Sequence, residues 1–545
     1  MRTEIKYIIN RLIAGESDLE KLKRDSSKKF SLSGPMKNTE IIGNFPNNKL
    51  TKEIRGLLLR KPMRTLSGVS PIAVMIKPIG SCKGKCIYCP YTGKAPKSYT
   101  GEEPAARRAR SCGFDPFLQV KIRLKQYKLN GHPTDKCEVI LMGGTFLQTP
   151  LKYQKWFVKR IYDGLNGSSS KTIEDAKKRN ERAKNRMVGL TIETRPDVFG
   201  KKELNRVLEF GCTRVEFGVQ HPNDEMYRKI KRGHTVQDVI EATERAKNAG
   251  LKVCYHLMLG LPGSNKKKDI RMIGRVFEKE EFRPDMLKVY PTLVMEGTEL
   301  WKMKERKEYK PLDTEETIEI LSELYKVVPP YVRIMRIQRD IPSQLINEGV
   351  RKSNLRQILE QRMKNTKTKS NEIRFKEIGL LRGKLGKTKL KRMDYKASKG
   401  KEIFLYFENE EGMIIGFIRM RIPKLGKEHR KEITLESAII RELHVYGKEI
   451  EIEKQNPKFK TSKTQDQVND ASFTDPQKLL FLSDSRPGYM VQHTGFGNRL
   501  LKEAERISKK EFRKKKMVII SGVGVREYYY KFGYTRDGAY VSKKM

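Results

Sequence analysis

The stretch SCKGKCIYCPY at residues 81–91 holds three cysteines, Cys82, Cys86 and Cys89, in the pattern C-x3-C-x2-C. Thiolates commonly hold [4Fe-4S] clusters, and three of them leave one iron without a protein ligand. An iron with an open position can bind a small molecule, as a catalytic zinc ion does. The pattern therefore predicts a cluster that binds S-adenosylmethionine (SAM), which one electron cleaves to a 5′-deoxyadenosyl radical.

Two other uses of these cysteines are less well supported. A structural zinc site needs a fourth ligand, and the next cysteine, Cys112, lies 23 residues after Cys89. Disulfides are disfavoured because the 7 cysteines are unevenly spaced and we expect no secretory leader. A radical SAM cluster is therefore the preferred interpretation.

Length and charge set further bounds. The chain has 545 residues, more than one hydrophobic core usually holds, so two large domains with accessory segments are expected. Its 114 Lys and Arg against 66 Asp and Glu give a net charge of +48. Ion-pair networks would be balanced in sign, so this excess predicts a polyanionic partner, most simply nucleic acid. No apolar run approaches the roughly 20 residues of a membrane span, so we expect a cytoplasmic protein with no membrane partner.

Residues 71–350 alternate short β-rich apolar runs with longer stretches of helical periodicity. The runs lie at residues 72–76, 139–142, 187–192, 215–219, 253–259 and 287–290, and the helical stretches include 117–129, 236–247 and 268–277. Repeated β-then-α units predict a parallel sheet, and about six of them predict a partial (βα)6 barrel of the TIM type. Chemistry gathers at the carboxyl ends of the strands in such α/β barrels, so this region is the predicted radical SAM domain.

The flanking regions differ from the barrel in composition. Residues 1–70 are basic and begin with an amphipathic pattern, which predicts a short helical module on a flexible tether, an arm that binds RNA. Residues 351–401 carry 18 Lys and Arg against 4 Asp and Glu, which predicts a basic linker lining a cleft. Residues 402–545 predict an α+β domain, with apolar runs at 403–407, 413–418 and 438–445, a helix at 497–509, a strand at 517–521 and a short helix near Glu527.

Glycine and polar residues follow several of the predicted barrel strands. Gly143, Gly144 and Thr145 end one strand, where backbone without side chains can approach a ligand and carbonyl groups can hold the ammonium group of SAM. Glu193 ends another strand and is a candidate acceptor for ribose hydroxyl groups, and Gln220 follows a third strand in the same way. Taken singly, each motif is equally typical of a plain turn.

The C-terminal region carries a second cofactor motif, QHTGFG at residues 492–497, with Gln492, Gly495 and Gly497 as its fixed positions. Glycines let backbone N–H groups point inward, and the N-terminus of the following helix adds positive potential, so a pyrophosphate can be bound. The motif follows an apolar strand at 441–446, an arrangement that resembles acetyl-CoA-dependent N-acetyltransferases of the GNAT type. Tyr528 and Tyr529 are catalytic candidates, since a phenol beside a thioester can protonate the departing thiolate. Core packing is the alternative for such an aromatic run.

A SAM-cleaving half followed by an acetyl-CoA half resembles the catalytic subunit of Elongator, the family of radical SAM tRNA uridine acetyltransferases, in its archaeal type. The resemblance runs from about residue 60 to the end of the chain. Six stretches carry it: CIYCP at 86–90, FDPFL at 114–118, IETRPD at 192–197, QRDIP at 338–342, RELHVYG at 441–447 and SGVGVR at 521–526.

The resemblance implies roles for residues of this chain. It implies that the cluster is held by Cys82, Cys86 and Cys89, and that SAM lies near Gly143, Gly144, Thr145 and Glu193. It implies acetyl-CoA contacts at Lys136, Glu442, Leu443, His444, Val445, Phe496, Gly497, Asn498 and Tyr529.

The activity that the resemblance implies is tRNA modification. SAM radical chemistry and acetyl-CoA would install a carboxymethyl-type group on C5 of the wobble uridine. The deoxyadenosyl radical would take hydrogen from the acetyl methyl group, the carbon radical would add to C5, and thioester hydrolysis would release CoA. The anticodon stem-loop of tRNA would lie along the basic linker and the N-terminal arm, because loop bases can be splayed into a pocket. An electron donor is a required partner, and the sequence leaves accessory subunits or a homodimer open.

Other functions stay open on the sequence alone. A protein lysine acetyltransferase would need only the C-terminal half, so Cys82→Ala would leave it active. A non-enzymatic RNA-binding scaffold would explain the charge without any use of SAM. A radical SAM RNA-modifying enzyme with another acyl donor is a closer rival, and measurements of CoA binding separate it.

Overall fold

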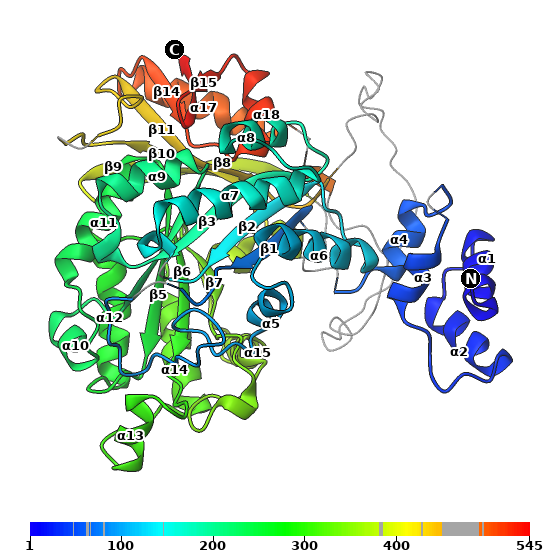
Figure 1. The fold of residues 1–545 in the computed structure, drawn as a ribbon. Helices are drawn as coiled ribbons and strands as arrows, with labels where there is room; N and C mark the ends of the chain where they lie inside the picture. The colour runs from blue at the N-terminus through cyan, green and yellow to red at the C-terminus, as the bar shows by residue number, and fades with distance from the viewer. Residues whose placement is uncertain are drawn as a thin grey trace.

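The computed structural model describes residues 1–46, 48–61, 65, 67–79, 82–144, 146–380, 385–426, 429–449, 490–492 and 495–545. Figure 1 shows an N-terminal group of helices at one side, a central sheet covered by helices, and a C-terminal sheet above it. None of the described helices combines the length and the apolar character that crossing a membrane requires.

The central sheet is parallel, and in the described part of the chain it has seven strands in sequence order. They are β1 (Val69–Met75), β2 (Lys136–Met142), β3 (Arg186–Thr194), β4 (Arg214–Gln220), β5 (Lys252–Leu259), β6 (Met286–Pro291) and β7 (Arg333–Arg336). Each predicted run overlaps one of the first six strands, so the predicted partial barrel is confirmed. The sequence does not predict β7, because its four residues, RIMR, are too few for a periodic signal.

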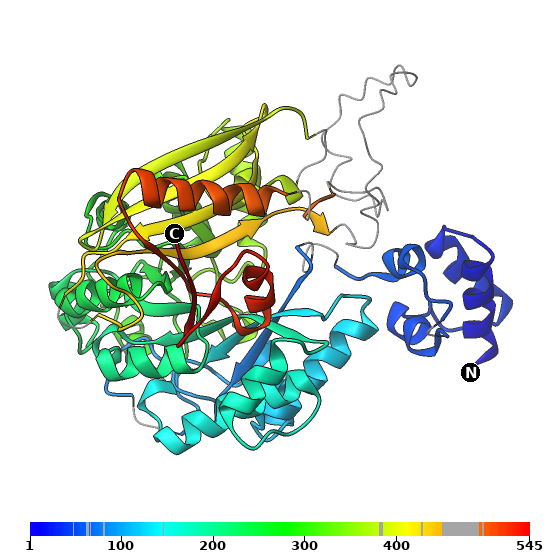
Figure 2. The same ribbon diagram turned by 90° about the horizontal axis from the view of Figure 1, so that it is seen from above.

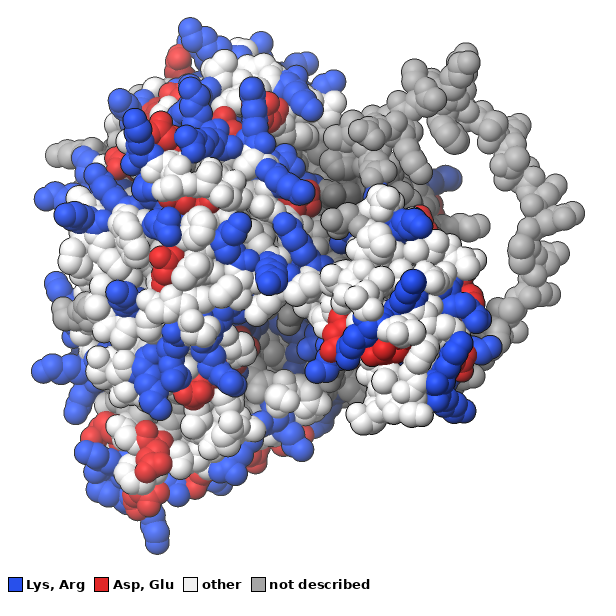
Figure 3. Space-filling model, turned by 45° about the vertical axis from the view of Figure 1, so that its right-hand side comes forward, with Lys and Arg blue, Asp and Glu red and all other residues white. Residues whose placement is uncertain are grey.

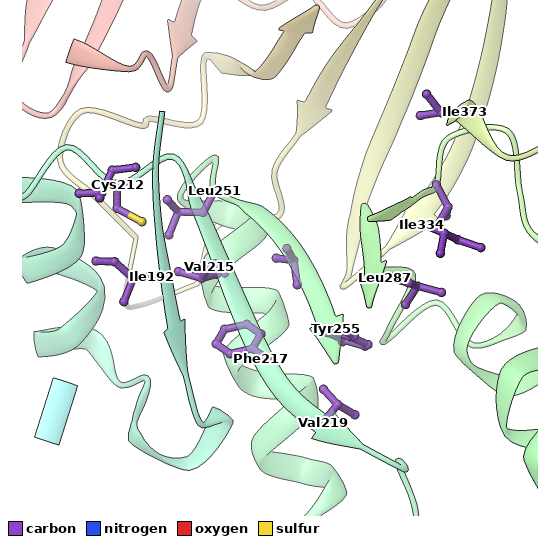
Figure 4. Close-up of a cluster of buried hydrophobic side chains, with 14 of the residues drawn as sticks. Ile192, Cys212, Val215, Phe217, Val219, Leu251, Tyr255, Leu287, Ile334 and Ile373 are labelled. Atoms are coloured by element: carbon purple, nitrogen blue, oxygen red, sulfur yellow. The ribbon is translucent and has the colours of Figure 1, made fainter. Parts of the chain in front are cut away.

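Helices connect the strands and cover the outside of the sheet (Figure 1). They are α5 (Pro104–Ser111), α6 (Pro116–Leu129), α7 (Leu151–Asn166), α8 (Ile173–Asn180), α9 (Lys201–Glu209), α10 (Asp224–Lys229), α11 (Val236–Asn248), α12 (Lys266–Glu278), α13 (Glu299–Glu305) and α14 (Thr314–Val327). In β4, Val215, Phe217 and Val219 are fully buried in the apolar cluster drawn in Figure 4. Because side chains alternate along a strand, Glu216 and Gln220 point the other way, into the barrel, where they line a cavity.

The N-terminal part is a module with a core of its own. Within the described residues it consists of α1 (Thr3–Ile13), α2 (Leu19–Lys29), α3 (Asn38–Asn44) and α4 (Lys52–Leu58). The prediction of one short helical unit on a tether was therefore too simple. Ile41, Ile42 and Phe45 are buried inside the stretch read as a tether, and a helix of seven residues is too short to show periodicity. α3 rests against the end of α6, where Gly43 lies beside Leu129.

The C-terminal sheet is mixed, and its described strands run in the order β15-β16-β14-β11-β10-β9-β8. They are β8 (Thr388–Ala397), β9 (Gly400–Asn409), β10 (Ile414–Ile422), β11 (Ser437–Val445), β14 (Lys516–Ile519), β15 (Thr535–Asp537) and β16 (Tyr540–Lys544). Figure 2 shows α17 (Phe496–Lys510) lying along one face of this sheet, against β9, β10 and β11. α18 (Arg526–Tyr530) follows β14, and β12 (Lys448–Glu449) pairs with β13 (Met490–Gln492).

The region predicted as a basic linker, residues 351–401, contains regular structure. α15 (Leu355–Asn365) and α16 (Ile373–Lys376) occupy its first part, and β8 is the edge strand of the C-terminal sheet. Most β8 side chains are exposed, including Lys389, Lys391 and Arg392, so the strand lacks the apolar alternation that would reveal it. Charged side chains on an edge strand hinder pairing with another chain. The C-terminal sheet thus includes residues before the predicted boundary at 402.

Buried ions join the C-terminal sheet to the amino ends of the barrel strands. Arg441 on β11 donates to both carboxylate oxygens of Asp285, at 2.8 and 2.5 Å, and to Glu402 at 3.0 Å. A further bond runs from Arg441 to the backbone oxygen of Leu251 at 2.9 Å. Lys247 lies 3.5 Å from Asp285. Because these groups are buried and mutually paired, they hold the two sheets in one orientation.

Candidate active site

The three cysteines of the sequence motif lie on one loop at the carboxyl end of the barrel. Cys82, Cys86 and Cys89 line a cavity of about 210 Å3 together with residues from the ends of β2 to β6. All seven cysteines of the chain lie in described regions and have free thiols. Three thiols that face one cavity fit a cluster with three protein ligands.

Tight packing and positive charge suit this loop to an anionic group. A Cβ atom on Gly84 would collide with Nη1 of Arg195 and lie 3.3 Å from Sγ of Cys86. Burial alone would raise the pKa of Cys86, but Arg232, which donates to its Sγ at 3.4 Å, lowers that pKa below its ordinary value. The pKa of Cys89 is raised to about 12, mainly by burial and secondly by the charge of Cys86. Guanidinium groups beside thiolates favour metal ligation.

Glu193 and Gly143, two of the residues predicted to contact SAM, meet at the edge of this cavity. Glu193 accepts hydrogen bonds from the Tyr99 hydroxyl at 2.7 Å and from the backbone N–H of Gly143 at 3.4 Å. Gly143 has a φ of 118°, and a Cβ atom there would lie 2.7 Å from Ile76. The position therefore requires glycine, and the carboxylate is held in one orientation.

The remaining residues predicted to contact SAM are Gly144, Gln220 and Thr145. Gly144 and Gln220 line the cavity. Gln220 has a φ of 66° next to an irregularity in the pairing of β4 with β5, a left-handed conformation that side chains rarely adopt and that concentrates at functional sites. Thr145 lies outside the described residues.

Charged side chains inside the barrel were missed by sequence reasoning. Glu216, His256 and Lys288 line the cavity. Nε2 of His256 lies 2.7 Å from Oε2 of Glu216, and the Lys288 ammonium donates to the same oxygen. Burial alone would raise the pKa of Glu216, but Lys288, His256 and Arg214 hold it well below its usual range. The sequence signal for such a residue is a lone charge between apolar neighbours, as Glu216 is beside Val215.

Residues predicted to bind acetyl-CoA gather where β11 ends and α17 begins. They are Glu442, Leu443, His444 and Val445 on β11, and Phe496, Gly497 and Asn498 in the first turn of α17. Nε2 of His444 and Oδ1 of Asn498 are buried and lack a hydrogen-bond partner within the described part of the chain. Because buried polar atoms are normally paired, these two are groups that a bound ligand can satisfy.

The glycine motif and the tyrosines meet at the N-terminus of α17. Gly495 precedes the helix with a φ of 94°, whereas only the backbone of Gln492, in β13, is described. A Cβ atom on Gly497 would lie 2.9 Å from the Tyr528 hydroxyl, so that phenol reaches the first turn of α17. Tyr529 is only 7% exposed and burial raises its pKa. Tyr528 is thus the better placed of the two catalytic candidates.

The two candidate sites lie toward opposite ends of the barrel strands. The cysteine cavity is at the carboxyl ends, while Glu442 lies 3.7 Å from Lys252, the first residue of β5. Lys136, a further predicted acetyl-CoA contact, is the first residue of β2. At about 3.3 Å per residue, the eight residues of β5 separate its ends by about 23 Å.

Comparison with known proteins finds relatives along the whole chain. Family models match residues 76–274 as the radical SAM superfamily, residues 284–365 as the Radical_SAM C-terminal domain and residues 1–66 as the ELP3 N-terminal domain. The chain is 42% identical to the tRNA uridine(34) acetyltransferase of Methanocaldococcus infernus, over 100% of this chain and 99% of that protein. It is 38% identical to Elongator complex protein 3 of Homo sapiens, over 99% of this chain and 96% of that protein.

A solved structure shares the fold. It is the archaeal Methanocaldococcus infernus Elp3 with an N-terminus deletion (1-46), which matches with a TM-score of 0.74 and 41% identity. The match covers 88% of this chain and 100% of the other, so it spans both the barrel and the C-terminal sheet.

Proposed function

This chain belongs to the family of the tRNA uridine(34) acetyltransferases and Elongator complex protein 3, and we propose on that basis that it is a radical SAM enzyme that modifies the wobble uridine of tRNA. The family resemblance predicted from the sequence motifs is confirmed. In the proposed reaction a two-carbon unit from acetyl-CoA is joined to C5 of the uridine as a carboxymethyl-type group. The observation that carries the proposal is the convergence of three thiols on one charged cavity.

Within the cavity, Cys82, Cys86 and Cys89 are the proposed ligands of the [4Fe-4S] cluster. When bound, the cluster supplies the electron that cleaves SAM and starts the radical chemistry. Glu193, which the Tyr99 hydroxyl holds at 2.7 Å, is the proposed acceptor for the ribose hydroxyl groups of SAM.

The C-terminal sheet is the proposed acetyl-CoA site. A helix N-terminus that follows a left-handed glycine can bind a pyrophosphate, and the buried polar atoms of His444 and Asn498 can pair with the ligand. The Tyr528 hydroxyl beside Gly497 is the proposed proton donor to the departing thiolate. Because this site and the cysteine cavity lie toward opposite ends of the strands, the acetyl group must cross about one strand length to react.

Positive charge favours tRNA as the partner. Figure 3 shows Lys and Arg side chains over the main body and the N-terminal helices alike. Lys83 and Lys85 are exposed on the cysteine loop itself. Phosphates that replace counterions at such side chains supply much of the affinity for nucleic acid, and a splayed loop base can enter a pocket. The N-terminal module and residues 351–401 are the proposed contacts of the stem-loop. An electron donor is the further partner that the reaction requires.

Anaerobic turnover with 13C-labelled acetyl-CoA tests the proposal. Reconstituted protein is incubated with a reductant, SAM and tRNA, and nucleosides are examined by mass spectrometry. We expect labelled carbon on the wobble uridine together with 5′-deoxyadenosine, and neither in Cys89→Ala. Deoxyadenosine with an unlabelled product would indicate another acyl donor. Acetylated protein that forms equally well in Cys89→Ala would indicate a lysine acetyltransferase instead.

A further inference from the structure

The inner face of the barrel carries ionisable side chains that the proposed function has not used. Glu216 on β4, His256 on β5 and Lys288 on β6 come from adjacent strands and share the cavity of the cysteines. Glu216 is fully buried and Lys288 is 8% exposed. A barrel interior that only filled space would hold branched apolar side chains. Burying charges there costs free energy, so packing does not explain them.

The charges of this group are ordered around one carboxylate. Lys288 donates to Oε2 of Glu216 and lies 3.8 Å from Oε1 of Glu193. Arg214 lies 3.3 Å from the other oxygen, Oε1, of Glu216. Two cations therefore contact Glu216 from different sides and favour its ionised form.

The hydrogen bond to Glu216 selects the tautomer of His256. An ionised carboxylate can only accept, so Nε2 of His256, at 2.7 Å from Oε2, is the donor. In a neutral imidazole the other nitrogen, Nδ1, is then free to accept a proton. The Tyr290 ring packs edge-on against the imidazole, with 5.8 Å between ring centroids and an angle of 84°. His256 is thus oriented from two sides in the cavity of the cysteines.

A bound metal ion is the competing use of this group. Glu216, Cys254 and His256 each offer one ligand atom, and these atoms lie within 4.8 Å of one another. However, the Lys288 ammonium already contacts the Glu216 oxygen that faces His256. An ammonium group in that place repels a metal ion, so the arrangement does not suit a metal site.

We propose that His256, oriented by Glu216, is the base that removes the C5 proton of the target uridine, an assignment that rests on the proposed function. Addition of the acetyl-derived carbon radical to C5 forms the carbon–carbon bond and leaves the unpaired electron on C6. The C5–H bond then breaks, and its proton goes to Nδ1 of His256. The C5=C6 double bond is restored as one surplus electron passes to a one-electron acceptor of the iron–sulfur class. Glu216 stabilises the imidazolium, as a carboxylate does beside the histidine of a hydrolase.

His256→Gln tests the assignment, because its amide N–H can still donate to Glu216 while its basicity is lost. In anaerobic turnover with labelled acetyl-CoA, this variant should form 5′-deoxyadenosine at nearly the wild-type rate. Labelled wobble uridine should fall by about 10²–10⁴-fold, the usual contribution of a general base. His429→Gln, an exposed histidine outside the cavity, is the matched control and should change neither product. Parallel loss or parallel retention of both products in His256→Gln would overturn the assignment.

A spectroscopic measurement on the wild type does not depend on turnover. The chain has 7 histidines, so NMR spectra of the full chain labelled with 15N-histidine, with the cluster oxidised, contain few imidazole signals. The signal that disappears in His256→Gln is that of His256. We expect the tautomer protonated at Nε2, with a shift of that signal in Glu216→Gln. A proton on Nδ1 instead, or zinc bound stoichiometrically and lost in His256→Gln, would overturn the assignment.

The experiments also separate this assignment from the function on which it rests. If the wild-type protein places no labelled carbon on uridine, both the proposed function and the role of His256 are wrong. If the wild type labels uridine and the His256→Gln variant is fully active as well, only the role of His256 is wrong.

Discussion

Replacing Arg441 by methionine should weaken the attachment of the C-terminal sheet to the barrel. Arg441 is buried and donates to Asp285, to Glu402 and to the backbone oxygen of Leu251. Methionine fills a similar volume but leaves the buried carboxylate of Asp285 without its main cation, while Glu402 still accepts from Arg421 at 2.7 Å. Removing one partner of a buried ion pair costs about 3–5 kcal/mol. Lys247, at 3.5 Å from Asp285 and 3.9 Å from Glu402, keeps part of the compensation, so we expect about 3 kcal/mol.

Thermal unfolding of the full chain measures this loss. About 3 kcal/mol lowers the Tm of a cooperative unit of about 150–250 residues by about 6–12 °C. Arg506→Met is the matched control, since Arg506 pairs with Glu503 on the surface of α17 and should leave the Tm unchanged. Combining Arg441→Met with Asp285→Asn should cost less than the sum of the single losses, because the stranded charge is removed. A fall of less than about 2 °C in Arg441→Met would show that these charges do not hold the interface.

Three further outcomes are expected. Cys89→Ala should lose most of its iron, whereas Cys112→Ala, whose thiol lies outside the cavity, should keep it. Equal iron and sulfide contents in the two variants would rule out Cys89 as a cluster ligand. In Gly497→Ala the new Cβ atom would lie 2.9 Å from the Tyr528 hydroxyl. The affinity for acetyl-CoA, measured by calorimetric titration, should therefore fall about tenfold. An unchanged Kd would count against an acetyl-CoA site at the start of α17. Burial lowers the pKa of His221 from 6.5 to about 4, so its contribution to stability is complete above pH 6.5 and is lost as the pH falls toward 4. We therefore compare the free energy of unfolding at pH 7 and pH 4 by urea denaturation. The decrease between the two should be about 3 kcal/mol smaller in His221→Gln than in the wild type. Equal decreases would show that His221 does not cause the loss of stability in acid.

The features that the sequence predicted well depend on local pattern. The spacing of Cys82, Cys86 and Cys89 needs only one loop, and the six apolar runs needed only their own composition to be identified as strands. Once those strands are parallel, their carboxyl ends share one edge of the sheet. That geometry places Glu193 and Gln220, from different strands, along one cavity.

The features that the sequence did not reveal depend on contacts between distant segments. Arg441 and Asp285 are 156 residues apart in the chain, and neither has a neighbour in sequence that marks its partner. Glu216, His256 and Lys288 each look like one stray polar residue in an apolar run, and the pairing register of the neighbouring strands β4, β5 and β6 brings them together. β8 was hidden for a related reason, since a charged edge strand has the composition of a linker.

Electron paramagnetic resonance of the reduced, reconstituted protein with SAM bearing 15N and 17O in its methionine part examines the open iron directly. If Cys82, Cys86 and Cys89 leave one iron for SAM, hyperfine coupling to the labelled amino and carboxylate groups should appear, with about four iron atoms per chain. The triple alanine variant at these positions should lose both the cluster and the coupling. A cluster signal that SAM does not alter, or one that persists in the triple variant, would mean that these cysteines do not build a SAM-cleaving centre.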